Sequence, residues 1–251
     1  MMSSMSLEDV AEVANGPVWF QLYVYRDREI TRQLIARAEA AGYSALVITL
    51  DAPVMGNRER DRRNNFKIPK QVTLKNLESF GLDKVADTHA DSSIAAYITS
   101  QIDPSLTWAD LEWLCSITKL PIILKGILRV DDAQRASEHG AAGIVVSNHG
   151  GRQLDTVPSA VDVLPAIAEA TGDNLEILVD GGIRRGTDVI KALALGANAV
   201  LVGRPVMWGL AVNGEAGVKH VLEILRTEFD TAMALCGCAS IKEITRDLIM
   251  E

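Results

Sequence analysis

The sequence predicts an α/β fold in which parallel strands alternate with helices. Short runs rich in valine, isoleucine and leucine recur along the chain, and each is followed by an amphipathic stretch. The runs are almost wholly apolar, as in parallel strands that are buried on both faces. Ala-Gly or Gly-Ala pairs at 41–42, 140–141 and 196–197 precede three of the runs, which is typical of a helix ending before the next strand. Together these features favour a parallel α/β architecture.

Six strands are predicted where the apolar runs fall: Val18–Leu22, Ala45–Leu50, Pro121–Leu124, Gly143–Ser147, Glu176–Val179 and Ala199–Val202. The amphipathic stretches between them predict helices at Ile30–Ala41, Trp108–Ile117, Val130–His139, Ala160–Ala170 and Thr187–Leu195. Beyond residue 205 the pattern is helical, through Val218–Leu235 and Ser240–Ile249. A closed (β/α)₈, or TIM, barrel has eight strands. The pattern therefore predicts a barrel of this type that is about two strands short.

One interval breaks the rhythm of strand and helix. Residues 54–104 are rich in charge and poor in periodic apolar residues. A long insertion at the carboxyl end of a strand is more often a lid or binding loop than a linker. We expect a single domain over residues 1–251, with a lid or insertion at about 54–104.

Composition narrows the class of protein. The 251 residues are 48% hydrophobic and 23% charged, values typical of one large globular domain rather than a disordered chain. A net charge of −8 does not predict nucleic-acid binding. No apolar run approaches the ~20 residues of a membrane helix, and the N-terminus lacks the features of a secretory signal. Three cysteines are too few for a disulfide framework or a metal site. We expect a cytoplasmic protein that binds neither a membrane nor a metal.

A histidine and an arginine follow the predicted strand that ends at Ser147. His149 and Arg152 are separated by two glycines, which let a ligand approach the backbone closely. A lone histidine at a strand end is usually structural, but the nearby arginine favours a catalytic reading. Histidine can act as a base near neutral pH, and arginine can hold a carboxylate through two hydrogen bonds. The pair suits proton abstraction from an anionic hydroxy acid.

The last two predicted strands end in glycine-rich turns that each carry an arginine. These turns are DGGIR at 180–184 and GR at 203–204. Backbone N–H groups and guanidinium groups after the final strands of a barrel are typical of a phosphate site. The alternative is two tight turns with solvated arginines. Lys125, at the end of another strand, adds a cation that could stabilise negative charge on a reduced cofactor ring.

Several segments together resemble the FMN-dependent 2-hydroxy-acid oxidases and dehydrogenases, a family that includes L-lactate oxidase and glycolate oxidase. The resemblance runs over nearly the whole chain, and the motifs after the fourth and fifth predicted strands are the most specific. The segments are FQLYVY (20–25), ITLDAP (48–53), LKGI (124–127), VSNHGGRQLD (146–155), VDGGIRRGTDVIKALALGA (179–197) and VGRPV (202–206).

The resemblance implies a role for each matching residue. His149 would be the base, supported by Asp51, with Tyr23 near the substrate hydroxyl. Arg152 and Arg58 would hold the substrate carboxylate. The remaining matches would contact FMN, and they are Ser3, Gln21, Thr49, Lys125, Ser147, Asp180, Gly181, Gly182, Arg184, Gly203 and Arg204.

The resemblance also implies an activity. The enzyme would oxidise a short (S)-2-hydroxy acid to the 2-oxo acid through FMN, with O₂ as acceptor and H₂O₂ as product. L-lactate is favoured over glycolate, because Met5 leaves room for a methyl group where glycolate-preferring relatives often have a bulky aromatic residue. The family further implies a homo-oligomer, a tetramer in many members.

Members of the family carry an additional N-terminal segment that holds the first strand and most of the second. Relative to them, this sequence predicts a barrel without those strands. Two other interpretations remain open. The chain could be a non-catalytic remnant of such an enzyme. It could also be a non-redox phosphate-binding barrel isomerase, although the pairing of His149 with Arg152, and the presence of Lys125 and Asp51, argue against a phosphorylated substrate.

Overall fold

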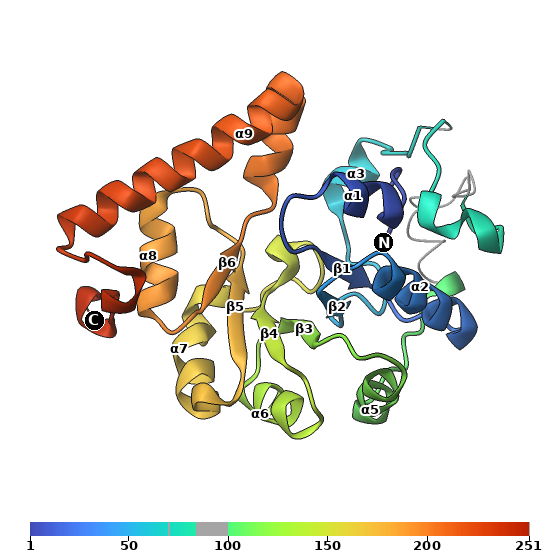
Figure 1. Ribbon diagram of the computed structural model, residues 1–251, viewed down its shortest axis with the longest axis horizontal. Coiled ribbons are helices and arrows are strands. Elements are labelled where there is room, and N and C mark those ends of the chain that lie inside the picture. Colours follow the sequence, from blue (N-terminus) through green and yellow to red (C-terminus); the bar gives the residue numbers. More distant parts are fainter. Residues whose placement is uncertain (70, 84–99, 251) are drawn as a thin grey trace. The chain divides into compact units, whose positions relative to one another are not determined.

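The computed structural model describes residues 1–69, 71–83 and 100–250 (Figure 1). The chain divides into two compact units. The first comprises Met1–Lys125, Glu138–Ala142 and Arg152–Leu154, and the second comprises Gly126–Ser137, Gly143–Gly151 and Asp155–Glu251. Of the predicted lid at 54–104, residue 70 and residues 84–99 lie outside the described residues.

All six predicted strands are present, and every strand pair within a unit is parallel. In the first unit β1 pairs with β2, and β2 with β3. In the second unit β4 pairs with β5, and β5 with β6. Every residue of β2 and of β4 is buried, as the continuous apolar runs predicted. The strands are β1 (Trp19–Leu22), β2 (Ala45–Thr49), β3 (Ile122–Ile127), β4 (Gly143–Val146), β5 (Glu176–Asp180) and β6 (Ala199–Leu201).

Helices follow the strands as predicted, and short helical turns occur between them. The predicted helices are α2 (Arg28–Ala40), α5 (Trp108–Ile117), α6 (Val130–Glu138), α7 (Ala160–Thr171) and α8 (Gly186–Ala194). The interval predicted as a lid also contains regular structure, namely α3 (Glu59–Arg63) and the 3-10 helix η1 (Lys75–Phe80). A further 3-10 turn, η3 (Gly172–Asn174), follows α7.

Helix α1 (Leu7–Val13) was not predicted, because seven residues are too few to show a periodic apolar face. Its start is fixed by a capping box in which Ser6 and Asp9 bond each other's backbone N–H. Leu7 is buried, and its N–H donates to Oδ1 of Asn76 at 2.7 Å. Its carbonyl accepts a hydrogen bond from the hydroxyl of Tyr43 at 3.0 Å. These contacts hold α1 within the first unit.

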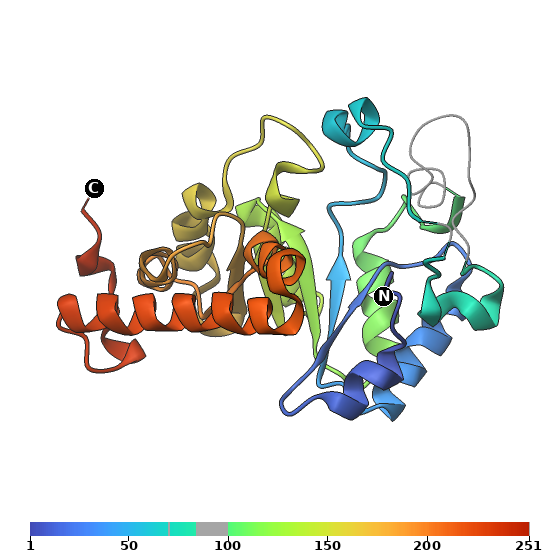
Figure 2. The ribbon, with the colours of Figure 1, turned by 90° about the horizontal axis from the view of Figure 1, so that it is seen from above.

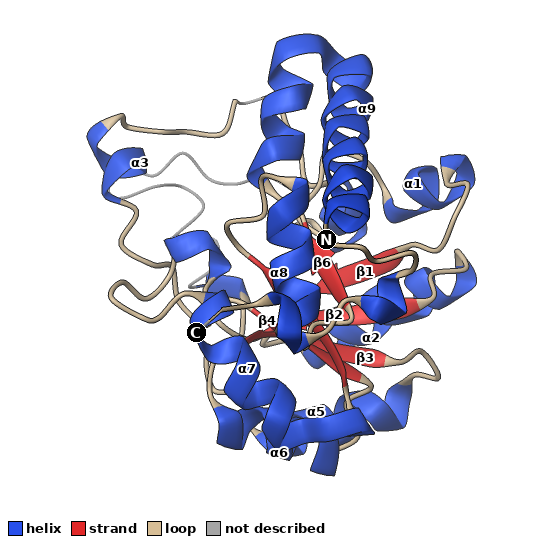
Figure 3. Ribbon diagram, turned by 90° about the vertical axis from the view of Figure 1, so that its left-hand side faces the viewer, coloured by secondary structure: helices blue, strands red, loops and turns tan. Residues whose placement is uncertain are grey.

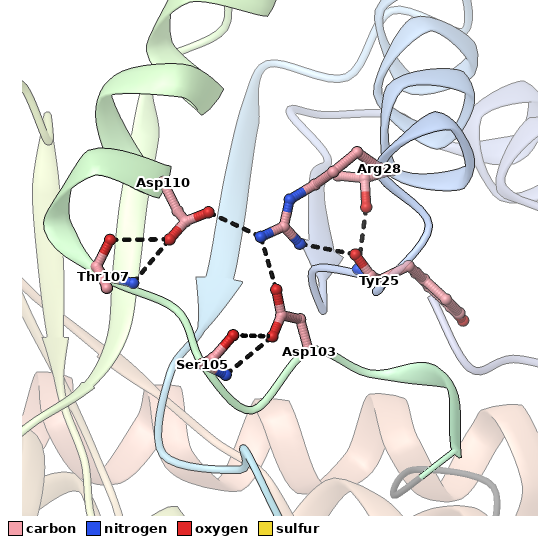
Figure 4. A network of polar contacts seen from close by, with 7 residues as sticks. Tyr25, Arg28, Asp103, Ser105, Thr107 and Asp110 are labelled. Carbon is pink, nitrogen blue, oxygen red and sulfur yellow. Dashed lines mark hydrogen bonds and ion pairs between the residues drawn. The ribbon is translucent and has the colours of Figure 1, made fainter.

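Arg28, the first residue of α2, joins three segments of the first unit (Figure 4). Its Nη2 contacts Oδ2 of Asp103 at 2.6 Å and Oδ1 of Asp110 at 2.7 Å. Its Nη1 donates to the carbonyl of Tyr25 at 2.7 Å. The guanidinium also lies 5.3 Å from the centre of the Trp113 ring. Because Asp103 follows the undescribed part of the insertion, this arginine ties the end of the insertion to the start of α2.

Each of the two carboxylates is oriented by its own local hydrogen bonds. Asp103 accepts from the backbone and hydroxyl of Ser105, and the hydroxyl bond is the largest of the effects that hold the pKa of Asp103 below its usual range. Asp110 accepts hydrogen bonds from the backbone N–H and the hydroxyl of Thr107, the N-cap residue of α5. The carboxylates are therefore in place for Arg28 without depending on it.

In the second unit, helix α7 contacts β4 and β5, and helix α8 contacts β6 and packs along α9 (Figure 3). Helix α9 spans Arg204–Leu235, as the helical pattern beyond residue 205 predicted, and breaks at Asn213 and Gly214 (Figure 2). The two stretches meet at Gly209 and Gly217, where a Cβ on Gly209 would lie 2.5 Å from the Gly217 carbonyl oxygen.

Among the described residues, no helix combines the length and apolar character needed to cross a membrane.

The predicted helix at Ser240–Ile249 is wrong. Two 3-10 turns, η4 (Ile241–Glu243) and η5 (Arg246–Leu248), occupy this stretch. The side chain of Glu243 accepts from the backbone N–H of Ala239 and the hydroxyl of Ser240, which satisfies these donors locally. Ile244 and Cys238 are buried against apolar residues of α8 and α9. Packing of the C-terminal residues against these helices therefore outweighs the helical pattern of their sequence.

We expect Arg28→Met to lower the free energy of unfolding by about 2 kcal/mol, because two partly buried carboxylates lose a charged hydrogen-bond donor. Urea unfolding followed by far-UV circular dichroism measures this loss. Arg63→Met is the matched control, since the Arg63–Glu59 pair is exposed and should contribute ~0.5 kcal/mol or less. Equal losses in the two variants would contradict the structural role of Arg28.

Candidate active site

Three predicted flavin contacts lie together at the carboxyl ends of the strands of the first unit. Thr49 is the last residue of β2 and is paired in register with Lys125 of β3. Gln21 of β1 reaches across to β2, where its Nε2 donates to Oγ1 of Thr49 at 3.0 Å. Thr49 is buried. The structure therefore brings Gln21, Thr49 and Lys125 to one edge of the sheet, as parallel pairing requires.

Tyr23, Asp51 and Arg58 follow these strand ends and influence one another electrostatically. Burial raises the pKa of the Tyr23 phenol, and the negative charge of Asp51 raises it further. The positive charge of Arg58 acts in the opposite direction on the same phenol. Tyr23 is thus held as a neutral hydroxyl, which can donate a hydrogen bond to an anionic or polar ligand.

The two predicted carboxylate-binding arginines also lie close together. Burial lowers the pKa of Arg58, and the positive charge of Arg152 lowers it further, while Asp61 raises it. Arg152 contacts Oδ2 of Asp61 through Nη2 at 3.5 Å. Within the described residues, the buried Nε of Arg58 has no hydrogen-bond acceptor. Two neighbouring cations and a buried donor fit an anion such as a carboxylate, whose charge would offset their repulsion.

Gln153 was not singled out from the sequence, although it lies in the motif that carries His149. Its Oε1 accepts from the Gly56 N–H and from Nη2 of Arg58, each at 3.3 Å. Its Nε2 donates to the carbonyl oxygens of Asp51 at 3.1 Å and of Val54 at 2.9 Å. An amide has no titratable proton, so reasoning from acid–base chemistry overlooks it. Only its position directly after Arg152 could have indicated a role.

In the second unit, His149 directly follows the Ser147-Asn148 pair at the end of β4. It begins the short 3-10 turn η2 (His149–Gly151) and has a φ of +56°, a conformation that costs energy for a residue with a side chain. Its N–H donates to Oγ of the buried Ser147 at 3.0 Å. The following Gly150 and Gly151 have φ values of +65° and +70°, which glycine adopts readily. Backbone geometry fixes the predicted base at the strand end.

The glycine-rich turns predicted to bind phosphate lie at the same edge of the second unit. Asp180 of β5 is paired in register with Leu201 of β6, so the chain leaves both strands side by side. Gly181 and Gly182 then take φ values of +90° and +79°. Gly203 is the N-cap of α9. The turn after β5 and the start of α9 are therefore neighbours, as the sequence predicted.

Two guanidinium groups accompany these turns. Nη2 of Arg204, the first residue of α9, donates to the Gly150 carbonyl at 3.4 Å. Arg184 lies over the ring of Trp208, with its Cζ 5.5 Å from the ring centre. A helix N-terminus with two arginines offers the donors and positive charge that a phosphate group requires. These residues fit the phosphate of FMN.

Ser3, the remaining predicted flavin contact, lies in the stretch before α1. Its Oγ accepts from the Met5 N–H at 3.1 Å, and its carbonyl accepts from the Lys75 N–H at 2.9 Å. The N-terminal stretch is thereby anchored to η1 in the first unit. Met5, on which the substrate preference was argued, is 53% exposed.

The chain is similar over its whole length to one known protein family. The model of the FMN-dependent dehydrogenase family matches residues 1–251. The chain is 55% identical to L-lactate oxidase from Nostoc sp., with 97% of this chain and 68% of that protein covered. It is 52% identical to 2-hydroxyacid oxidase 1 from Homo sapiens, with 99% and 69% covered. A crystal structure of mandelate oxidase with (S)-4-hydroxymandelic acid matches with a TM-score of 0.92 at 49% identity, covering 97% of this chain and 68% of that one. This similarity confirms the predicted barrel type, and the chain spans about two thirds of the length of these relatives.

We expect Tyr23 to titrate above the ordinary tyrosine pKa of ~10. The difference in tyrosinate absorbance between the wild-type chain and Tyr23→Phe, recorded against pH, isolates this phenol. Because its folded pKa is raised, Tyr23 contributes stability below its unfolded pKa, and this stability is lost as pH rises through the folded pKa.

Asp51→Asn should lower the pKa of Tyr23 towards its ordinary value, because a negative charge beside the phenol is removed. The pKa of Tyr43, which burial and Glu8 raise, should not respond to this change and serves as the control. A Tyr23 pKa that is ordinary in the wild type, or that is unaffected by Asp51→Asn, would contradict this description of the site.

Proposed function

Because the chain belongs to the FMN-dependent dehydrogenase family, we propose that it oxidises a short (S)-2-hydroxy acid to the corresponding 2-oxo acid. The observation that carries this proposal is the pair of neighbouring arginines, Arg58 and Arg152, with a buried guanidinium N–H that has no acceptor among the described residues. Such a pair suits a small carboxylate, which every 2-hydroxy acid carries. The glycine-rich turns with Arg184 and Arg204 suit the phosphate of the family's cofactor.

In this proposal the two arginines bind and orient the substrate carboxylate. Binding the anion offsets the repulsion between Arg58 and Arg152 and provides an acceptor for the buried Nε of Arg58. Tyr23, kept neutral by burial and by Asp51, donates a hydrogen bond near the substrate hydroxyl. Orientation of this kind holds the α-carbon in a single geometry, which lowers the barrier of the chemical step.

His149 is the proposed base. Its neutral imidazole takes the proton of the substrate hydroxyl, while the α-hydrogen leaves with its electron pair and the C–O bond becomes a carbonyl. The substrate loses one proton and one hydride equivalent, and the histidine becomes an imidazolium. Asp51 is the carboxylate proposed to stabilise that positive charge. FMN, when bound, supplies the acceptor for the two electrons and the hydrogen that leave with them.

The other predicted residues would hold FMN. Arg184, Arg204 and the N-terminus at Gly203 would bind its phosphate, and Lys125 would place a positive charge beside the ring. The remaining contacts are proposed for Ser3, Gln21, Thr49, Ser147, Asp180, Gly181 and Gly182.

The finer assignments rest on the relatives and on Met5. We propose L-lactate as the preferred substrate and glycolate as the next, with O₂ as the acceptor that yields H₂O₂. The relatives named for these activities are an L-lactate oxidase and several glycolate oxidases. We further propose a cytoplasmic homotetramer.

The decisive experiment is the visible absorption spectrum of the purified chain, reconstituted with FMN, before and after anaerobic L-lactate. Bound flavin that loses its absorption with L-lactate, but not with D-lactate, would support the proposal. Re-admitting air and assaying H₂O₂ then tests the acceptor, and glycolate tests the substrate preference. Protein that does not take up FMN, or whose flavin L-lactate and glycolate both leave oxidised, would overturn the proposal.

His149→Gln should lower the rate of anaerobic flavin reduction by ~10²–10⁴-fold, the usual effect of removing a general base. FMN affinity should stay within about twofold, because the substitution leaves the phosphate-binding residues intact. Stopped-flow absorbance gives the rate, and titration of FMN fluorescence gives the affinity. His139→Gln is the control, since His139 pairs with Glu112 on the surface of the first unit and has no proposed catalytic role. A reduction rate unchanged in His149→Gln would exclude this histidine as the base.

A further inference from the structure

We propose that Gln153 is a positioning residue that holds Arg58 and the backbone after Asp51 in the geometry required to bind the substrate carboxylate. The inference rests on the proposed function, because it concerns the same carboxylate site. Gln153 has no chemistry of its own to contribute to the reaction. Its effect is exerted through the arginine and the loop that it contacts.

The four hydrogen bonds of Gln153 all end on one short stretch of chain. Its amide nitrogen binds the carbonyl oxygens of Asp51 and Val54, and its amide oxygen binds Gly56 N–H and Arg58 Nη2. One side chain therefore fixes both the start and the end of the segment 51–58. This segment follows β2. It begins at Asp51, the proposed support of the base, and ends at Arg58, a proposed carboxylate-binding arginine.

The contact also depends on close approach of the two backbones. A Cβ on Gly56 would lie 2.5 Å from the carbonyl oxygen of Arg152 and 2.7 Å from that of Gln153. Only glycine fits at this position without displacing one chain from the other. The segment that carries Arg58 thus lies directly against the segment that carries Arg152. The hydrogen bonds of Gln153 join the two segments at this point.

An amide is the group that this position requires. Two carbonyl oxygens need a donor, and a backbone N–H and a guanidinium need an acceptor, so glutamine satisfies all four at once. A glutamate would bring its oxygens against the Asp51 and Val54 carbonyls. It would also place a negative charge beside Arg58, in competition with an incoming carboxylate.

Arg58 needs to be held in position because its surroundings disfavour the positive charge of its guanidinium. Partial burial of the guanidinium disfavours its charge, and the nearby Arg152 repels it. Without a fixed acceptor on Nη2, the side chain would gain solvation by turning outward. The bond to Gln153 opposes that motion and keeps the buried Nε in place to donate to an anion.

The test is calorimetric titration of the chain with oxalate, a dicarboxylate that has no α-hydrogen to lose. Gln153→Met retains length and volume but removes all four hydrogen bonds, and we expect it to weaken oxalate binding by roughly tenfold or more. Gln153→Glu should bind oxalate no better than Gln153→Met. Gln33→Met is the matched control, since Gln33 is exposed on α2 and bonds only Glu29 in the described structure. It should bind oxalate like the wild type.

A second measurement separates positioning from a general loss of structure. If Gln153 acts through Arg58, the double variant Gln153→Met/Arg58→Met should bind oxalate no more weakly than Arg58→Met alone. FMN affinity should stay within about twofold in Gln153→Met, because Gln153 is not among the proposed FMN contacts. Thermal unfolding establishes that each variant is folded.

The outcomes distinguish the inference from the function on which it rests. Failure of the wild-type chain to take up FMN, or to reduce it with a hydroxy acid, counts against the proposed function. Oxalate binding that is equal in the wild type and in folded Gln153→Met, or absent from both, overturns the inference. Additive effects of the Gln153 and Arg58 substitutions overturn it as well, because the glutamine would then act independently of the arginine.

Discussion

Parallel pairing of doubly buried strands is the constraint on which the rest of this structure depends. A strand such as β2 or β4 that is buried along its whole length has no place for a charged side chain. Charged and polar side chains therefore lie at the ends of such strands or just beyond them. Because neighbouring parallel strands point the same way, their carboxyl ends meet at one edge, and the residues just beyond them become neighbours. This explains why Thr49 and Lys125 are adjacent in one unit, and why Asp180 is paired with Leu201, shortly before the start of α9, in the other.

The same residue type serves different purposes in the first unit according to how its donors are satisfied. Arg28 is bonded to Asp103, Asp110 and a backbone carbonyl, so its charge is balanced within the protein. That arrangement is structural and joins the end of the long insertion to α2. Arg58 has the opposite surroundings, with burial and Arg152 both disfavouring its charge and with a buried Nε that has no acceptor in the described residues. An arginine left in this condition indicates a binding site for an anion.

The second unit uses backbone conformation rather than buried charge. His149 is held at φ +56° between a buried serine and two glycines, and Gly181 and Gly182 take positive φ values after β5. In the turn that follows His149, the Gly150 carbonyl accepts a hydrogen bond from Nη2 of Arg204. Helix α9 contributes its N-terminus to this edge. Of these positive-φ residues only His149 has a side chain, so the strain is confined to the position of the proposed base.

The sequence by itself determined the order of strands and helices along the chain and which strands are buried. It also determined the family and the identity of most candidate site residues. Apolar runs and glycine-rich turns are local signals, and the motifs around His149 and Asp180 are specific enough to identify the family. The break in α9 at Asn213 and Gly214, the 3-10 turns in place of a helix at 240–249, and the existence of α1 were decided by tertiary packing. So was the role of Gln153, because hydrogen bonds between residues nearly a hundred positions apart leave no periodic signal in the chain. Chemistry-bearing side chains can be recognised from their type and position, whereas the neutral groups that orient them become visible only when distant segments meet.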